Sequence, residues 1–331
     1  MKKVTAIALA VVVCGAPALA GPMKADQVAG DARWVAHLDV TTLLKSGLAK
    51  FILAEAEKKD SFLDGIAQVR EALGFDPLRD LRGVTIYGKT IGDEQAVVVL
   101  DATANQEKLL ALIGANPSYR AHEYGDRELH EWTDEPKTVV DKMTGEEVVK
   151  PGKTNFGAFY DPNTVLVAST LDLLKGAVTV LDGEADSLAK TRGIKMLPEP
   201  LAGSFLIAAA DRIKLPADHK DAKNPVLTSI TDIGLQVGEQ EDHMFLSAAA
   251  LAPDAKRALR LRQILQGFIA LGQMMLAERQ DLPVLGETIR VNGEGNSVTV
   301  EASVPTGSMI EMIQHLAAKK ARAAGGGSDA F

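Results

Sequence analysis

The chain has 331 residues, with 36 basic and 44 acidic side chains and a formal net charge of −8. This acidic balance opposes nucleic-acid binding, which needs a basic face to displace counterions from phosphates. Cys14 is the only cysteine, so an intramolecular disulfide and a cysteine-based metal site are excluded. The length suggests two domains or one duplicated unit.

Residues 1–20 have the three parts of a secretory signal peptide. The cationic start, the apolar core and the small-residue cleavage site are Lys2-Lys3, residues 4–13 and Ala18-Leu19-Ala20. The apolar run is shorter than the about 20 residues of a membrane span, so a retained anchor is disfavoured. Val13 stands where a lipoprotein has a small residue, which disfavours lipidation of Cys14. We therefore expect cleavage after Ala20 and an exported protein, in the periplasm or outside the cell.

Removal of residues 1–20 takes away two lysines and no acidic residue, which leaves 34 basic and 44 acidic side chains and a charge of −10. No later segment has the length and apolarity of a membrane helix. We therefore expect neither a nucleic-acid partner nor a transmembrane helix in the mature chain.

A lead segment, residues 21–32, precedes the expected first module at 33–185. Alternation over residues 34–40 predicts a strand, and apolar spacings of three and four over residues 42–73 predict two helices. Ser61 is the expected cap between these helices, and Gly74 their end. The remaining expected elements are a hairpin of 84–87 with 96–101, a helix from a Thr103/Gln106 capping box to Ile113, hairpins turning at Gly125-Asp126 and Thr144-Gly145, strands 156–160 and 164–168, and a helix Leu171–Leu181.

Residues 186–202 are the expected linker, residues 203–322 the second module and residues 323–331 a disordered tail. The second module is expected to contain a strand 204–210, a hairpin of 233–237 with 243–251, a helix 255–280, a hairpin of 288–291 with 297–304, and a last helix that starts at a Ser308/Glu311 capping box. The element order of the first module repeats, which indicates an internal duplication. The predicted fold class is α+β: two similar modules with mainly antiparallel sheets covered by helices.

Three stretches resemble uncharacterised exported α+β proteins of planctomycete-type bacteria. They are LGFDPLRDLRGVTIYG at residues 73–88, FGAFYDPNTVLVAST at 156–170, and the late helix–hairpin–helix. That family is described by a domain of unknown function, so the resemblance implies a location and an architecture but no substrate, cofactor or site residue.

His122-Glu123 and His130 superficially suggest a zinc motif, which needs two histidines on one helix face. A two-residue turn at Gly125-Asp126 instead pairs His122 with Leu129 and Ala121 with His130, which puts the histidines on opposite sheet faces. We therefore expect no metal site here.

Ser187 and Lys190 form the four-residue pattern SxxK of penicillin-binding proteins and serine β-lactamases. The companion patterns Ser-Asp-Asn and Lys-Thr-Gly are missing, so Ser187 is expected to be a helix cap. His37 and Asp39 share the less apolar face of the first strand, and we expect them on the surface. Gly293 and Gly295 lie between two alternating stretches, which is typical of a hairpin loop and not of a phosphate-binding loop.

The helix 255–280 carries a broad apolar face that includes Ala258, Leu261, Leu265, Phe268, Gly272 and Met275. A core helix covering a sheet is the simplest interpretation. Met274, Met275, Gly267 and Gly272 also allow adaptable packing against an apolar ligand or a partner helix. Burial of these side chains distinguishes the two.

No catalytic, cofactor-binding or metal-ligating residue is assigned, and no cofactor is expected. The leading hypothesis is a non-enzymatic binding or interaction module, whose partner would be an envelope protein or an apolar ligand. The alternatives are an extracytoplasmic hydrolase with a dispersed active site and a carrier of an apolar ligand in a cavity beneath helix 255–280.

Overall fold

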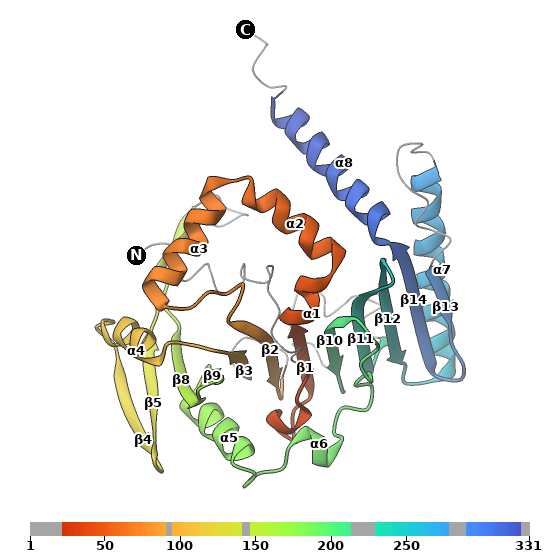
Figure 1. Cartoon of the computed structure of the whole chain (residues 1–331). Coiled ribbons are helices and arrows are strands. Elements are labelled where there is room, and N and C mark those ends of the chain that lie inside the picture. The colour runs from red at the N-terminus through yellow and green to blue at the C-terminus, as the bar shows by residue number, and fades with distance from the viewer. Residues whose placement is uncertain (1–21, 91–94, 141–145, 213–228, 278–288, 326–331) are drawn as a thin grey trace. The chain divides into compact units, whose positions relative to one another are not determined.

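The computed structural model of the chain describes residues 22–90, 95–140, 146–212, 229–277 and 289–325 (Figure 1). Of residues 275–277 and 319–325 it describes only the backbone. The chain divides into two compact units. The first contains the residues up to Leu44 and Ala56–Lys195, and the second contains Lys45–Glu55 and the residues from Met196 onward.

Seven strands in the described part of the first unit form an antiparallel sheet in the order β1-β2-β3-β9-β8-β5-β4. They are β1 (Trp34–Asp39), β2 (Leu81–Gly88), β3 (Ala96–Ala102), β4 (Arg120–Tyr124), β5 (Arg127–Thr133), β8 (Thr154–Asp161) and β9 (Thr164–Ala168). A separate ribbon of β6 (Lys137–Val140) and β7 (Glu147–Lys150) matches the expected exposed hairpin.

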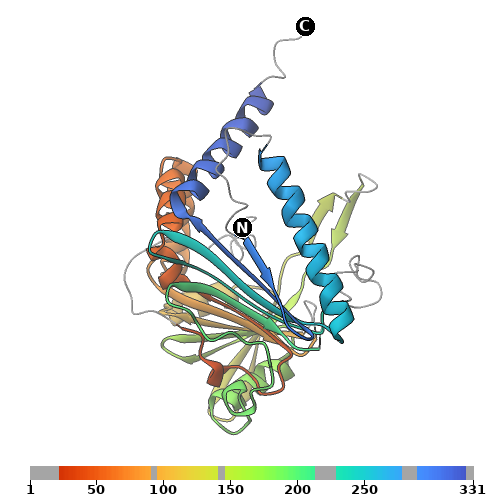
Figure 2. The same cartoon turned by 90° about the vertical axis from the view of Figure 1, so that its right-hand side faces the viewer.

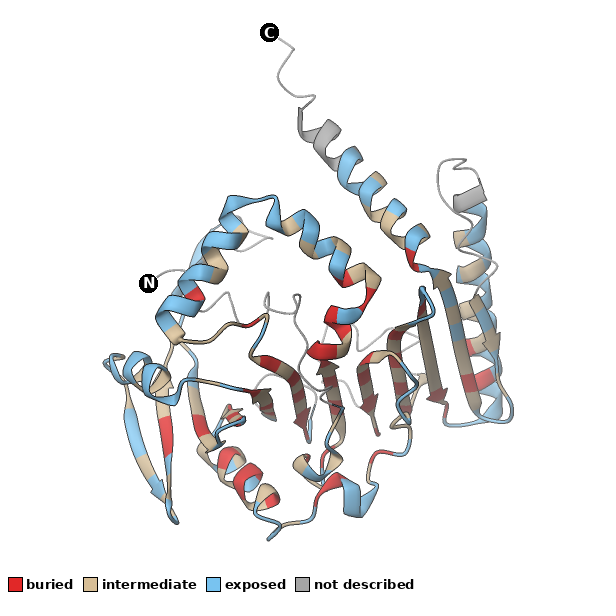
Figure 3. Ribbon diagram, viewed as in Figure 1, coloured by how far each residue is buried: buried red, intermediate tan, exposed pale blue. Residues whose placement is uncertain are grey.

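The helical segments from residue 25 to residue 191 are η2 (Ala25–Gln27), α1 (Val40–Lys45), α2 (Gly47–Glu57), α3 (Asp60–Leu73), α4 (Gln106–Gly114), α5 (Leu171–Leu181) and α6 (Leu188–Thr191). Alternate strand residues are buried (Figure 3). Helix α5 and η2 pack together, and α5 also packs against β3, β8 and β9. The α5 bounds are those expected, because its apolar spacing and its Thr170 cap are both local signals.

Three expectations about helix starts are wrong. Residues 42–73 form parts of three helices and not two, because α1 ends at Lys45 and the Ser46 hydroxyl accepts a hydrogen bond from the Ala49 amide at the start of α2. Helix α3 begins after Lys59 and not at Ser61. Asn105, two residues after the expected cap Thr103, caps α4 by accepting from the Lys108 amide at 3.0 Å.

Five strands in the described part of the second unit form an antiparallel sheet in the order β10-β11-β12-β14-β13. They are β10 (Ser204–Ala210), β11 (Asp232–Gln240), β12 (His243–Leu251), β13 (Ile289–Asn292) and β14 (Ser297–Pro305). Helix α7 (Ala255–Ala277) precedes β13, and α8 (Thr306–Gly325) follows β14. Helix α8 starts at Thr306, so the expectation that Ser308 caps it is wrong. The helix expected at 255–280 is α7, and the last three residues of that range lie outside the described residues.

The two sheets repeat one order of strands. β1-β2-β3-β9-β8 in the first unit corresponds to β10-β11-β12-β14-β13 in the second, with α4 corresponding to α7 and α5 to α8. The strands β4 to β7 are additional in the first unit. The α+β class with antiparallel sheets is thus confirmed, while descent from one duplicated unit remains a prediction.

One face of the second sheet is apolar across all five strands. Two cross-strand rows are Leu206, Val237, Leu246, Ala302 and Ile289, and Ala208, Leu235, Ala248, Val300 and Val291. Each of these side chains is only half-buried. Helix α7 packs against β13 and β14, at the end of these rows.

Candidate functional site

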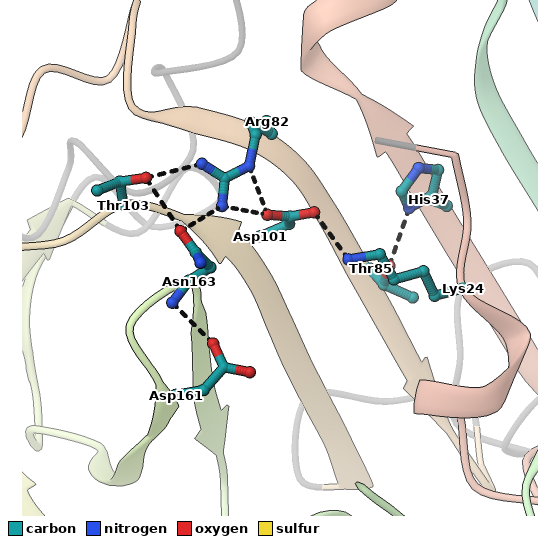
Figure 4. A network of polar contacts seen from close by, with 8 residues as sticks. All are labelled: Lys24, His37, Arg82, Thr85, Asp101, Thr103, Asp161 and Asn163. Carbon is teal, nitrogen blue, oxygen red and sulfur yellow. Dashed lines mark hydrogen bonds and ion pairs between the residues drawn. The ribbon is translucent and has the colours of Figure 1, made fainter. Parts of the chain in front are cut away.

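A network of charged groups joins β2, β3 and the β8–β9 turn of the first unit (Figure 4). Arg82 donates to Asp101 at 2.7 Å, to Thr103 at 2.7 Å and to Asn163 at 3.1 Å. Lys24 donates to the other Asp101 oxygen at 3.1 Å. The neighbouring cavity holds about 10 Å³, which is about the least that admits one water. The network therefore ties strands together and leaves no room for a substrate.

His37 and Asp39 are buried, so their expected surface position is wrong. The face of β1 that bears these two residues also bears Val35, and all three side chains are buried. The His37 Nδ1 lies 2.9 Å from the Thr85 hydroxyl, whereas Asp39 accepts from the amide and the hydroxyl of Thr42 at 2.9 and 2.7 Å. Asp39 therefore caps α1, and the two residues do not act as a pair.

The predicted pairing of the β4–β5 hairpin is confirmed: His122 lies opposite Leu129, and Ala121 lies opposite His130. The two histidines consequently have different neighbours. His122 Nε2 is 2.7 Å from a Glu131 carboxylate oxygen.

The buried His130 Nδ1 is 3.0 Å from the Tyr119 hydroxyl, and its ring lies edge-on to Phe159. Burial lowers the pKa of His130, and the negative charge of Glu128 raises it by less. Within the described ranges, no group of three or more His, Cys, Asp or Glu residues is arranged to hold a metal ion.

The SxxK residues do not form a nucleophile–base arrangement that faces a cavity. Ser187 is buried at the N-cap position of α6, as expected, but its hydroxyl makes no capping hydrogen bond. Lys190 is exposed and lies 3.9 Å from Asp186. Helix α6 has four residues, about one turn.

A cleft of about 420 Å³ opens beside α5 in the first unit. One wall is a face of α5 with Leu173, Gly176, Ala177 and Val180. A Cβ added at Gly176 would meet nothing within 4 Å, so the helix leaves space there. The volume is in the range of small-ligand sites, about 300–1,000 Å³.

Tyr87 lines this cleft at the end of β2. Its side chain is buried, and no described group meets hydrogen-bond geometry with its hydroxyl. Burial and the nearby Asp31 carboxylate raise the pKa of Tyr87, and the Ala29 backbone amide lowers it by less. Tyr87 is therefore a neutral phenol and not a base. At the mouth, Lys89 forms an ion pair with Asp31 at 2.5 Å.

The N-terminal half of α7 is part of a core. Ala258 and Leu261 are each 1% exposed and form a cluster with Ala252 and Val298, against which Leu265 and Val291 pack. Side chains spaced three and four apart face the same side of a helix, which is why these α7 positions meet the sheet together. The core interpretation is correct for this half.

The C-terminal half of α7 is exposed. Phe268 and Met274 are each 63% exposed, and Leu271 is 56% exposed. Figure 2 shows α7 leaving the sheet of the second unit as it runs toward its C-terminus. Gly267 leaves open space around it, and the side chain of Met275 lies outside the described residues. The surface-contact interpretation therefore fits this half of the helix.

The sequence reasoning singled out α7 but missed the cleft and Tyr87. The one local signal for the cleft was Gly176-Ala177 on an otherwise large-residue helix face, and Tyr87 was simply one residue of an alternating strand. Among the helices in the part of the chain that the structure describes, none is long and apolar enough to cross a membrane.

Comparisons with known proteins give no family. No protein-family model and no curated protein matches the chain. Crystal form III of TP0453 is similar over 88% of this chain and 98% of that chain, at 8% identity and a TM-score of 0.47. Crystal form I covers 89% and 98%, at 8% identity and a TM-score of 0.43. Similarity at this level supports no statement about activity.

Proposed function

We propose that the chain is an exported, non-enzymatic binding protein that contacts an apolar partner through the C-terminal half of α7. The observation that carries this proposal is the change of burial along a single helix, from Leu261 in the core to Phe268 in solvent. Phe268, Leu271 and Met274 are spaced by three residues, so they form a contiguous strip.

Contact of this apolar strip with water is unfavourable in free energy, and a partner that covers the strip removes that contact. Burial of apolar surface contributes about 25 cal/mol per Å², which is about 1.5–3 kcal/mol for a large side chain buried completely. Single exposed apolar residues are common, whereas a contiguous patch marks an interaction site. The two apolar rows of the second sheet are only half-buried, so the unit exposes apolar surface outside the helix too.

Export is supported by the signal-peptide pattern of residues 1–20, and location in the periplasm or at the cell surface is part of the proposal. We also propose descent from the planctomycete-type exported family, and a duplication that would account for the shared strand order. An envelope location would place α7 near apolar partners.

Two alternatives have different support. The 420 Å³ cleft favours a carrier of a small ligand, although it lies beside α5 and not beneath α7 as that hypothesis required. A dispersed hydrolase has less support, because His37, His122 and His130 each contact a group other than a serine or cysteine nucleophile. Native mass spectrometry of the purified mature chain would show a co-purified ligand if the cleft is a carrier site.

The test of the α7 contact uses the absence of cysteine from the sequence after Ala20. A Met274→Cys variant carries an environment-sensitive dye, and a Leu63→Cys variant carries the same dye on α3, where Leu63 is 48% exposed. Membranes and soluble proteins of the cell envelope are tested as separate fractions. We expect at least one fraction to shift the dye emission to the blue at position 274 and not at position 63. Equal responses at both positions would contradict the proposal.

A further inference from the structure

The exposed strip of α7 continues into a cluster of positive charges. Lys256, Arg257 and Arg260, in the first two turns, are all exposed, and Arg257 lies 3.8 Å from the exposed Asp254 carboxylate just before the helix. Arg262 is the other charged residue of α7 and donates to the Gly293 carbonyl oxygen at 2.6 Å. Helix α7 contains no acidic residue, although the whole chain has a net charge of −8. The helix is therefore a basic element in an acidic protein.

The positive charges and the apolar residues lie on one stripe of α7. Arg257, Arg260, Ile264, Phe268 and Leu271 follow one another at spacings of three, four, four and three. At 100° per residue these positions fall within one narrow sector of the helix. The stripe is cationic at its N-terminal end and apolar at its C-terminal end.

Resting on the proposed function, we infer that this stripe binds the surface of a lipid bilayer with anionic headgroups. Helices that lie in a membrane interface combine Lys and Arg with Phe and Leu in this way, with the apolar side chains in the boundary between headgroups and acyl chains. Each Lys or Arg near an anionic surface adds to the binding. The acidic remainder of the chain is repelled, which favours contact through α7.

A second copy of the chain fits the same stripe less well. Two such stripes packed on each other would bring Arg257 and Arg260 toward the equivalent arginines, or the apolar end of each toward charges of the other. An anionic bilayer offers negative charge and an apolar layer together, so it complements both ends of the stripe.

The experiment measures co-sedimentation of the full mature chain with vesicles. One set is phosphatidylcholine alone, and the other is phosphatidylcholine mixed with phosphatidylglycerol. We expect binding that is about tenfold tighter for the anionic set and that weakens as salt rises, because salt screens the charges. The double variant Phe268→Ser/Leu271→Ser is expected to weaken it about tenfold or more, since two exposed apolar side chains are lost.

The matched control is Leu63→Ser, which replaces a leucine of the first unit that is 48% exposed. It should bind as the wild type does, and circular dichroism should show that all variants are folded. Equal loss in the control, or full binding by the double variant, would show that α7 is not the contact. Equal binding to both vesicle sets would refute the anionic preference.

The same dye-labelled variants separate this inference from the proposed function. If the wild type binds neither vesicle set but the dye at position 274 responds to soluble envelope proteins, the bilayer inference is wrong and the proposed function stands. If position 274 responds to neither vesicles nor envelope fractions, both are wrong.

Discussion

Arg82 on β2 donates from both Nε and Nη2 to one oxygen of Asp101 on β3, at 2.7 and 2.6 Å. Both side chains are 19% exposed, so this ion pair is shielded from water much better than the surface pairs of the chain. A shielded carboxylate that loses its charge leaves the guanidinium without a counter-charge.

We therefore expect Asp101→Asn to lower the free energy of unfolding by about 1–3 kcal/mol, the range for a lost charge-assisted contact. Urea denaturation measures the change. Lys190→Met removes an exposed pair with Asp186 at 3.9 Å, and should stay within about 0.5 kcal/mol of the wild type. Similar costs for the two variants would mean that the network does not stabilise the sheet.

His130 should make stability depend on pH. Its pKa in the folded chain lies below the ordinary value of 6.5 because of burial, so the unfolded chain takes up the proton first as the pH falls. The His130 contribution is therefore complete above pH 6.5 and decreases as the pH falls from there toward the folded-state pKa.

Denaturant unfolding at several pH values between about 5 and 8 tests this, because the His130→Gln variant should show a smaller decrease than the wild type below the ordinary histidine pKa. Titration of the His130 ring by NMR gives the folded-state value directly. A value above 6.5 would contradict the assignment.

Truncation of Leu261 should cost far more stability than truncation of Phe268, although the two residues lie two turns apart on similar sides of α7. Leu261→Ala removes a core side chain and should cost about 2–4 kcal/mol. Phe268→Ala removes an exposed one and should change stability by less than about 0.5 kcal/mol. Thermal or urea unfolding of the lipid-free chain measures both, and a large loss for Phe268→Ala would mean that the strip packs within the chain.

Alanine substitutions at Gly234 and at Gly267 should change the stability of the chain in opposite directions. A Cβ at Gly234 on β11 would lie 1.7 Å from the Met196 carbonyl oxygen, so Gly234→Ala must displace the backbone there and destabilise the second unit. A Cβ at Gly267 meets nothing within 4 Å, and alanine is favoured over glycine inside a helix by about 0.8–1 kcal/mol. Gly267→Ala should therefore raise the unfolding midpoint in the same urea assay.

Local patterns were enough for much of the fold. The helix Leu171–Leu181, the strand Ser204–Ala210 and the His122–Leu129 pairing follow from spacing, caps and a two-residue turn. The cap of α4 was misplaced by two residues, because Thr103 and Asn105 are both capping residue types and the sequence pattern alone does not choose between them.

The candidate surface could be predicted only in part. Periodicity identified an apolar helix from residue 255 onward, but it assigns Leu261 and Phe268 to similar sides without saying how far the sheet extends beneath them. The cleft beside α5 had only Gly176-Ala177 as a local signal, because the rest of its lining comes from segments far apart in the chain.

The sequence by itself determined the charge balance, the signal-peptide pattern, the α+β class and the hairpin geometry, since these depend on composition or on residues near one another in the chain. The tertiary structure decided which polar residues are buried and which half of α7 is free. His37, Asp39 and Phe268 show the reason: burial depends on what packs against a residue from distant segments, and periodicity describes only the residue's own element.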